Sequence, residues 1–281
     1  MNKTVLSLSG VVLLGAASAS AQYSAYLPGK SQFVVTPTYV FSTYDSFWAG
    51  DQKVKLQAAT GAKEQNQHTG SIGLEYGICE VFALDATLGY TAAIFSGGSE
   101  DSGLSDTTLG VRWNFVDERK INCPYMPTMS LRLGGIIRGT YDPKFPFSAG
   151  DGASGFESSL LFGKAICPGF GLYGDIGWRI RTHDVPQDLF GSVGAYATSH
   201  GFTLSAGYRH VQGLSGPDIG GPGFMTTYGF PQVKEINQLV EAGLGYRDSG
   251  GRYYQVFGAF SVDGRNTGDK TVIGGSISFP F

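Results

Sequence analysis

Apolar and polar residues alternate along much of this chain, and the alternation is clearest over residues 270–281 (KTVIGGSISFPF). Thr271, Ile273 and Ile277 share one face of an extended strand with the aromatic residues, while small or hydroxyl side chains fall mostly on the other face. This period of two predicts a β-strand that separates an apolar phase from a polar one. The last strand of an outer-membrane barrel has this pattern. The last core strand of a secreted β-sandwich is the alternative.

The same alternation recurs in twelve segments, which predict twelve strands, with ten or fourteen as the alternatives. They span residues 33–41, 71–76, 82–90, 106–115, 129–138, 156–166, 170–181, 190–198, 202–208, 235–246, 253–262 and 270–281. The segment 190–198 has the weakest pattern, because neither of its faces is clearly apolar. Pro37 has no N–H group to donate, so we expect a missing hydrogen bond or a bulge in the first strand.

The connections between these segments alternate between long and short. Polar loops follow most odd-numbered segments, the longest at 212–234, and tight turns follow the second, sixth, eighth and tenth segments. The connection at 116–127 is longer than this rule predicts. Short periplasmic turns and longer outer loops are typical of outer-membrane barrels, and an even strand number leaves both termini in the periplasm. The predicted fold class is therefore an all-β, transmembrane antiparallel β-barrel.

Residues 1–21 have the features of a cleaved signal peptide. Lys3 precedes an apolar run at 5–17, and the segment ends on the small residues Ala19, Ser20 and Ala21. We therefore expect a barrel domain over residues 22–281, in the outer membrane of a Gram-negative bacterium. No later apolar run reaches the ~18 residues that a helical span needs.

Composition agrees with one barrel domain. The chain has 43 glycines, 13% aromatic residues and 15% charged residues, with no composition break that would divide it. Its formal net charge of -3 gives no indication of nucleic-acid binding. Expected partners are outer-membrane lipid and the barrel-assembly machinery, because the aromatic last residue, Phe281, resembles the assembly signal of outer-membrane proteins. A monomer is favoured.

Three motifs resemble successive motifs of one barrel family. They are LEYG at 74–77, GLSDTTLG at 103–110 and PTMSL at 127–131. The family is that of outer-membrane proteins named for the MetA pathway of phenol degradation, whose members are described as transporters. The likeness is strongest over 71–133, and it departs from the family pattern at Ser105, where glycine is expected, and at 138–141, where RGTY replaces Pro-Thr-Gly. The resemblance implies a barrel and a transporter-like role, but names no solute.

Nothing in the pattern of reactive residues predicts a catalytic centre. None of the four histidines has a serine two residues away, the spacing that would place a base and a nucleophile on one strand face. They are His68, His183, His200 and His210. No His/Cys/Asp cluster has the spacing of a zinc site, so we expect no metal and no cofactor. Acidic loops at 99–101 and 150–152 could bind calcium, although solvated loop charges are the simpler interpretation.

Charged residues on the inward faces of the predicted strands are the candidate site. Asp85, Arg112 and Arg132 lie at similar heights on neighbouring strands, so we expect them to meet inside the barrel. Nearer the outer mouth we expect a second set, namely Arg138, Glu157, Arg179 and Arg181, with Arg209 facing Glu241 across two later strands. The full predicted set of pore-lining residues is Asp85, Asp106, Arg112, Arg132, Arg138, Glu157, Asp175, Arg179, Arg181, Arg209 and Glu241.

Two interpretations of these charges stay open. Buried charges need partners or water, so they could fill a narrow lumen as mutually paired groups, or form the constriction of a polar pathway. The second interpretation predicts a channel for passive passage of small polar or aromatic solutes, in which Arg112 and Arg132 are solvated and replaceable by alanine. The first predicts a closed structural or adhesion barrel whose outer loops bind a partner. A membrane-embedded hydrolase is a third, less favoured function.

The three cysteines, Cys79, Cys123 and Cys167, all fall in predicted periplasmic turns. The periplasm oxidises thiols, but three cysteines cannot all pair within one chain. Cys123 lies between the other two around the rim and in the longest turn. We therefore expect one disulfide, Cys123 to Cys167 or Cys79 to Cys123, with three free thiols as the alternative.

Overall fold

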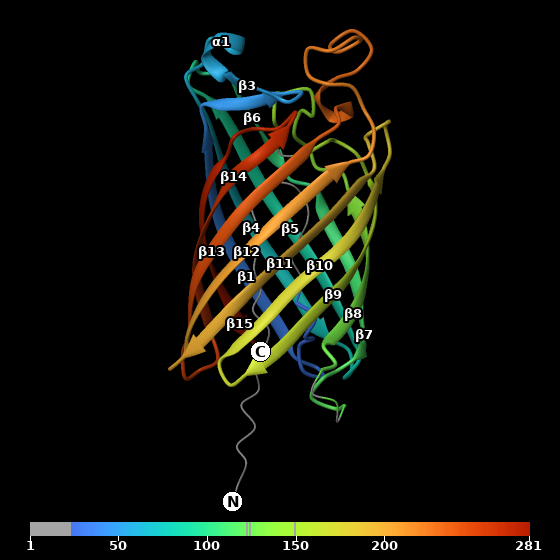
Figure 1. Ribbon diagram of the computed structural model, residues 1–281, viewed down its shortest axis with the longest axis vertical. Helices are drawn as coiled ribbons and strands as arrows, with labels where there is room; N and C mark the ends of the chain where they lie inside the picture. The colour runs from blue at the N-terminus through green and yellow to red at the C-terminus, as the bar shows by residue number, and fades with distance from the viewer. Residues whose placement is uncertain (1–23, 122, 124, 149) are drawn as a thin grey trace, which may run out of the picture.

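A closed barrel of antiparallel strands forms the body of the protein (Figure 1). The computed structural model describes residues 24–281 except residues 122, 124 and 149. Twelve strands make up the ring, which closes through pairing of the last strand with the first, as the sequence predicted. In ring order they are β1 (Phe33–Tyr44), β4 (Gln65–Gly77), β5 (Phe82–Phe95), β7 (Thr107–Val116), β8 (Thr128–Ile137), β9 (Gly155–Cys167), β10 (Phe170–Arg181), β11 (Asp188–Ser199), β12 (Phe202–Gly213), β13 (Ile236–Arg247), β14 (Tyr253–Arg265) and β15 (Thr271–Pro280).

Shorter elements lie in the loops. They are the hairpin of β2 (Ser46–Ala49) and β3 (Gln52–Lys55), α1 (Leu56–Thr60), β6 (Glu100–Leu104), which pairs with β5, and the 3-10 helix η1 (Phe230–Gln232). The gaps between the alternating segments predicted polar loops over about 45–67 and over 96–105. That prediction was wrong in part, because β2, β3, α1, β6 and the first residues of β4 lie in these segments. The first residues of β4 were missed because neither of their faces is apolar. Asn66 and His68 occupy the outward positions there, so the alternation is invisible in the sequence.

The barrel has a terminal end, where β1 begins and β15 ends, and a loop end, where α1 and the longer loops lie (Figure 1). The turns at the terminal end are 78–81, 117–127, 168–169, 200–201 and 248–252. The predicted alternation of short and long connections is confirmed in part: 117–127 is long, as the sequence indicated, and the loop-end connections 182–187 and 266–270 are short. Which side of a membrane each end faces stays a prediction. In the part of the chain that the structure describes, no helix is both long and apolar enough to cross a membrane.

The outer face of the barrel is apolar. Ile176 and Ile273 are each 63% exposed, and most other outward positions carry large apolar side chains. Aromatic rings gather near the terminal end, where ring centroids lie 6.4 Å apart between Phe82 and Trp113 and 4.8 Å apart between Phe202 and Tyr246. An apolar surface edged by an aromatic band is typical of barrels that face lipid.

Many glycines of the inner face serve as seats for aromatic rings from the neighbouring strand. The ring of Phe257 lies on Gly274, where an added Cβ would stand 2.4 Å from the ring, and the ring of Phe190 lies on Gly177 in the same way, at 2.3 Å. Phe190 belongs to β11, whose pattern was the weakest in the sequence. That weakness has its reason here, because β11 turns aromatic side chains toward the lumen as well as apolar ones outward.

The seam between β1 and β15 is interrupted. Val35 pairs with Phe279 and Thr38 with Ser276, but the two intervening residues of β1, one of them Pro37, have no partner in this ladder. This interruption confirms the expectation for Pro37. Beyond β15 the backbone N–H of Phe281 donates to the carbonyl of Phe33 (2.8 Å), so the last residue continues the seam. The role of Phe281 in assembly stays a prediction.

The cysteines do not form the expected bridge. Cys79, Cys123 and Cys167 are all free thiols in the structure, so neither Cys123 to Cys167 nor Cys79 to Cys123 is present. They lie on three different turns, between β4 and β5, β7 and β8, and β9 and β10. Because a disulfide needs Cα atoms within roughly 7 Å, side chains on separate turns pair only when those turns fold toward one another.

Candidate functional site

An unbroken series of ion pairs crosses the inner wall of the barrel. Carboxylates and guanidinium groups alternate along it, in the order Glu75, Arg112, Asp85, Arg132, Glu157, Arg179, Asp188, Arg181 and Asp151. We call these nine residues the charge ladder. They come from the consecutive strands β4 to β11 of the ring and from the loop between β8 and β9.

Arg132 lies at the centre of the charge ladder. Its Nη2 lies 2.7 Å from Asp85 Oδ1, its Nε donates to the same carboxylate at 3.0 Å, and its Nη1 contacts Glu157. On the other side of Asp85, Arg112 Nε lies 3.6 Å from Oδ2, and the guanidinium reaches Glu75. Arg112 and Arg132 are 0% and 1% exposed. Each buried charge therefore depends on its neighbours for compensation.

Local backbone geometry makes room for this packing. Arg112 and Arg132 stand directly opposite each other on β7 and β8, where like charges repel unless acids intervene. Asp85 contacts both. A Cβ at Gly110 would lie 2.7 Å from Arg132 Nη2, and one at Gly134 would lie 2.6 Å from Nη1. Both positions therefore need glycine for the guanidinium of Arg132 to lie flat against the wall.

The predicted meeting of Asp85, Arg112 and Arg132 inside the barrel is thus confirmed. Arg209 and Glu241 also face one another as predicted, with 3.0 Å between Nη2 and Oε2. The expectation that Arg112 and Arg132 are solvated was wrong. Both guanidinium groups are enclosed by carboxylates, backbone and neighbouring strands, so replacing them by alanine would leave buried acids without partners.

The predicted second set near the outer mouth was wrong as a separate cluster. Its members Glu157, Arg179 and Arg181 continue the same charge ladder. Arg138 is not part of it, since its side chain is exposed just past the end of β8, where the backbone leaves the strand. Asp175 does face the lumen, where it accepts a hydrogen bond from Ser192 Oγ.

Three ladder residues were missing from the sequence-based set. Glu75 occupies an inward position of β4, so its parity in the strand was a usable signal. Asp188 lay outside the predicted strand 190–198, because β11 begins two residues earlier than its apolar pattern. Asp151 comes from a loop, and no strand pattern could place it beside Arg181.

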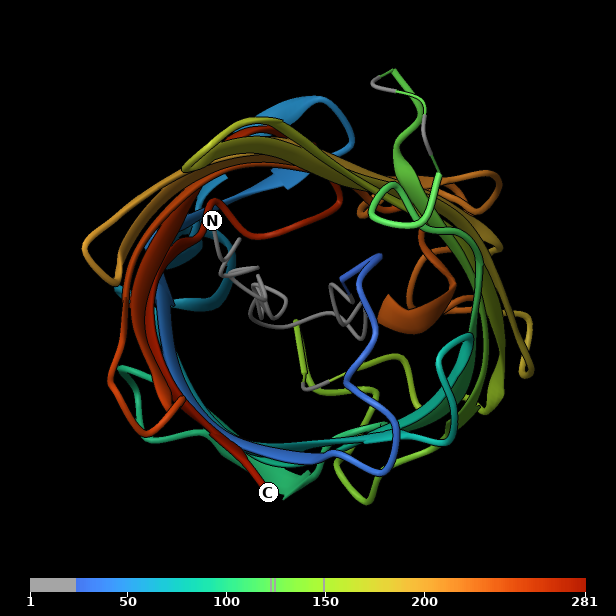
Figure 2. The ribbon, with the colours of Figure 1, turned by 90° about the horizontal axis from the view of Figure 1, so that it is seen from below.

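The segment 24–32 lies inside the ring of strands at the terminal end and extends from the start of β1 toward β7 and β8 (Figure 2). Arg112 Nη1 donates to the carbonyl of Ser24 at 3.1 Å, and Ser130 Oγ donates to the carbonyl of Ala25 at 2.6 Å. Ala25 is buried. One end of the charge ladder therefore also holds the chain that precedes β1, an arrangement that no pattern in the sequence indicated.

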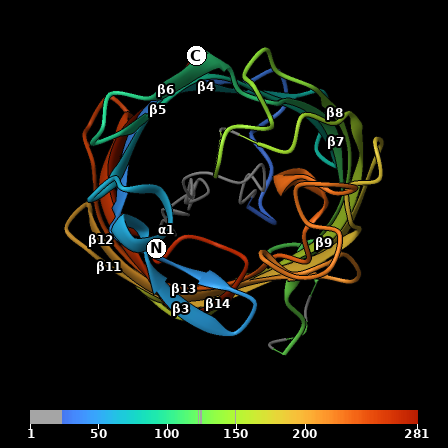
Figure 3. The same ribbon diagram turned by 90° about the horizontal axis from the view of Figure 1, so that it is seen from above.

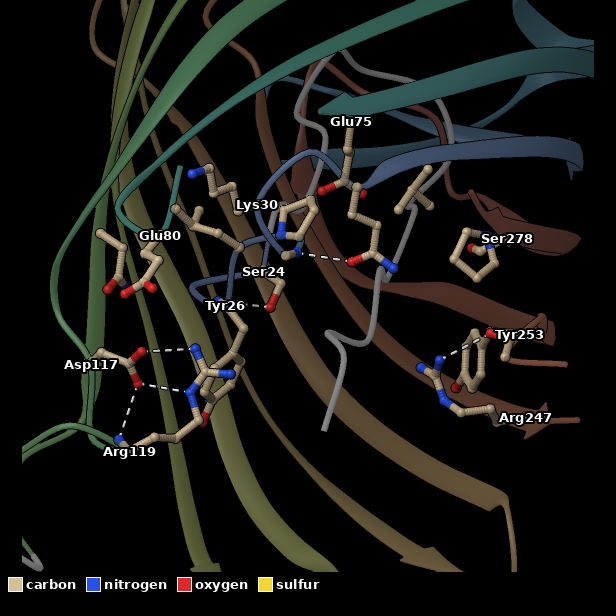
Figure 4. A pocket seen from close by; sticks show the side chains of 18 of the residues that line it. Ser24, Tyr26, Lys30, Glu75, Glu80, Asp117, Arg119, Arg247, Tyr253 and Ser278 are labelled. Carbon is tan, nitrogen blue, oxygen red and sulfur yellow. Dashed lines mark hydrogen bonds and ion pairs between the residues drawn. The ribbon is translucent and has the colours of Figure 1, made fainter. Parts of the chain in front are cut away.

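Beside this segment lies a cavity of about 630 Å³. Asp117 and Arg119 line one side of it, and Tyr253 and Ser278 stand across the space from them (Figure 4). Asp117 and Arg119 form a two-point ion pair, with 2.8 Å from Nε to Oδ1 and from Nη2 to Oδ2. The acid and base on that side thus neutralise each other, and a space of this size accommodates a small organic solute.

The loop between β8 and β9 folds inward at the other end of the barrel. We call residues 138–154, residue 149 excepted, the lid; it reaches into the barrel opening in the view from above (Figure 3). The ring centroid of Phe147 lies 5.5 Å from that of Tyr44, and the centroid of Phe145 lies 5.2 Å from that of Phe95. These partners belong to β1 and β5, so the lid crosses from one wall of the barrel toward the other.

Hydrogen bonds and an ion pair of two carboxylates connect the lid to the barrel. Asp106, between β6 and β7, accepts hydrogen bonds from the Tyr141 hydroxyl at 2.6 Å and from the Gly139 N–H at 2.9 Å. Asp151, itself a lid residue, pairs with Arg181 of the charge ladder. Asp106 was predicted to line the pore. In the structure its carboxylate instead accepts hydrogen bonds from two lid residues.

Acidification should favour the closed lid. Burial raises the pKa of the Asp106 carboxyl and outweighs the hydrogen bonds from Tyr141 and Gly139 that lower it; Asp151 adds to the rise and Arg181 opposes it. A carboxyl that opens to water returns to an ordinary pKa of about 3.9, so the closed state binds the proton more tightly. The stabilisation is present below the ordinary value and is lost as the pH rises through the raised value. Conductance should therefore fall on acidification, as measured in planar bilayers.

The matched variants separate Asp106 from other loop acids. Asp106→Asn should behave like the protonated form, with low conductance at every pH. Asp184→Asn changes an exposed acid of the same end and should leave the pH profile as in the wild type. An unchanged profile in Asp106→Asn would assign the pH response to another group.

The histidines lie apart from the lumen charges. His183 and His200 are exposed turn residues, and their Nδ1 atoms lie 2.8 Å from the hydroxyls of Thr182 and Ser199. His68 lies on the outer face, with Nδ1 2.7 Å from the Tyr39 hydroxyl. Within the described ranges, no group of three or more His, Cys, Asp or Glu side chains could hold a metal ion.

Comparison with known proteins supports the fold. The chain matches no family model and no curated protein. It is similar in structure to the COG4313 outer membrane channel from Pseudomonas putida F1, with a TM-score of 0.72 and 13% identity over 93% of this chain and 100% of that one. It is also similar to the β domain of the Bordetella autotransporter BrkA, with a TM-score of 0.51 and 13% identity over 90% of this chain and 100% of that one. Identities this low show a shared fold alone.

Proposed function

We propose that this protein is an outer-membrane channel for the passive passage of small polar or aromatic solutes. The solute enters or leaves through the cavity beside residues 24–32, and the lid controls access at the loop end. The charge ladder acts as a rigid brace of the wall, and its paired charges leave little net field in the lumen. This assignment favours uncharged solutes over ions.

The cavity of about 630 Å³ at the terminal end is the observation that carries this proposal. A barrel that served only as a scaffold would have no reason to keep such a space, because filling it with side chains would add stability. Its lining is mixed in polarity and lies inside a barrel whose outer face is apolar. The similar structure from Pseudomonas putida is itself described as an outer membrane channel, which supports the same role here.

A closed structural barrel is the competing function, and the charge ladder favours it. Continuous ion pairs brace seven neighbouring strands, and the lid covers the loop end. Vesicle swelling distinguishes the two. Reconstituted protein should let small neutral sugars enter faster than protein-free vesicles do. Equal swelling rates, with folded protein inserted, would support the closed barrel.

Loosening the segment 24–32 should increase passage. The Tyr26 hydroxyl donates to Glu118, and the Tyr26 ring lies against Gly163 and within 5.7 Å of the Arg119 guanidinium. A hydrogen bond to a charged group contributes about 1.5–3 kcal/mol, so its loss should raise the displaced population by roughly tenfold or more. Tyr26→Phe should therefore increase sugar-induced swelling, and Tyr26→Ala should increase it further.

A matched tyrosine provides the control for this measurement. Tyr125→Phe changes an 89% exposed tyrosine at the same end of the barrel and should leave swelling unchanged. If Tyr26→Ala also leaves it unchanged, residues 24–32 do not limit the route.

A further inference from the structure

One sector of the inner wall carries no charge. Inward residues of 36–40 on β1, 253–257 on β14 and 274–278 on β15 form it, and none of these fifteen positions is acidic or basic. We call these inward residues the neutral wall. Its lowest row includes Tyr253 and Ser278, which line the cavity at the terminal end (Figure 4). The neutral wall therefore leads from that cavity into the barrel.

The polar groups of the neutral wall have spare hydrogen-bonding capacity. Among the described residues, both amide atoms of Gln255 and the hydroxyl of Thr38 are buried without a hydrogen-bond partner. Gln255 and Thr38 are 4% and 6% exposed and flank Ser276 in register on adjacent strands. Unsatisfied polar groups gathered at one place indicate a missing partner.

Aromatic rings lie on both sides of the row formed by Thr38, Ser276 and Gln255, one toward the terminal end and one toward the loop end. The Tyr253 ring lies on Gly245 and the Phe257 ring on Gly274, so each ring is seated in the wall. Tyr253 pairs with Ser278 one row below Gln255, and Phe257 pairs with Gly274 one row above. The Arg247 guanidinium lies 5.4 Å from the Tyr253 ring centroid, so Phe257 is the ring of this pair that offers a face to a flat solute.

From these observations we infer that the neutral wall is a binding site for an uncharged ring compound that carries hydroxyl groups. The ring of the compound packs on the Phe257 face, and its hydroxyls exchange hydrogen bonds with Gln255 and Thr38. An anionic analogue is disfavoured at the row of Gln255 and Thr38, because its carboxylate would lose water beside residues that carry no positive charge. The nearby cation, Arg247 of β13, lies one row lower, over the Tyr253 ring. The inference rests on the proposed channel function only for the route by which the solute reaches the wall.

Equilibrium binding tests the site without any need for transport. Saturation-transfer NMR titrations on the folded mature barrel in detergent should show binding of glucose, of catechol, or of both, which separates a polyol ring from a phenolic ring. Their matched acids, glucuronate and 3,4-dihydroxybenzoate, should bind more weakly. Gln255→Leu should weaken binding by about fivefold, the effect of losing one or two neutral hydrogen bonds.

Thr38→Val should weaken binding in the same direction as Gln255→Leu. Thr198→Val is the matched control, since Thr198 lies elsewhere on the inner face and its hydroxyl already bonds Thr203 at 3.2 Å. Binding that is absent, equal for neutral and acidic rings, or unchanged in Gln255→Leu would overturn the inference. Conductance without such binding would overturn this inference alone, and binding without conductance would overturn the proposed channel alone.

Discussion

A chain with Arg132→Met should largely fail to accumulate as a folded barrel. Methionine fills a similar volume but leaves Asp85 and Glu157 buried without their shared cation. Breaking a buried ion pair by removing one partner typically costs about 3–5 kcal/mol, a large part of the stability of an ordinary domain. Heat-modifiable migration on gels and urea titration of refolding into lipid vesicles both report the loss.

Arg138→Met is the matched control, because Arg138 is exposed and stands outside the charge ladder. It should fold as the wild type does. Neutralising the stranded acids in Arg132→Met/Asp85→Asn/Glu157→Gln should restore part of the lost stability, since the cost comes from unpaired charge. If Arg132→Met alone refolds with the stability of the wild type, the ladder is solvated and its brace role is wrong.

Removing the two aromatic anchors of the lid should open the barrel. Phe147 has a left-handed backbone, with φ of 52°, a conformation that costs a bulky residue energy and persists when packing compensates. Aromatic pairs of this kind contribute about 0.5–1.5 kcal/mol each, so losing those of Phe145 and Phe147 should shift the lid roughly tenfold toward open. Phe145→Ser/Phe147→Ser should therefore show a several-fold higher mean conductance.

Met225→Ser controls for the loss of a bulky side chain from a left-handed loop position. Met225 has φ of 61° and is 66% exposed in another loop of the same end, so its replacement should leave conductance as in the wild type. If the double lid variant also conducts as the wild type does, the lid either stays docked without its anchors or does not limit the current.

Alternation within the strands made the barrel predictable from sequence. Each strand faces two media, so the period of two appears wherever the outward face is apolar. The prediction failed where that contrast vanishes. β4 projects past the apolar surface with Asn66 and His68 outward, and β11 turns Phe190 inward onto a glycine seat.

The contact of Asp85, Arg112 and Arg132 was also predictable, because all three occupy inward positions at similar distances from the ends of neighbouring strands. These strand positions did not predict whether the three side chains are buried or solvated, because burial depends on side-chain packing across strands. The contacts of loop residues could not be predicted for the same reason. Asp151 and the lid are placed by contacts with Arg181 and with aromatic rings far away in the chain, and no local pattern encodes such contacts.

Single-channel recording of the wild-type barrel in a planar bilayer shows most directly whether the barrel is a channel. We expect small, discrete current steps at neutral pH, because the cavity beside residues 24–32 offers a narrow route and the lid covers the loop end for part of the time. Folded, inserted protein that stays silent as wild type and as Phe145→Ser/Phe147→Ser would contradict this expectation, and would establish a closed barrel instead.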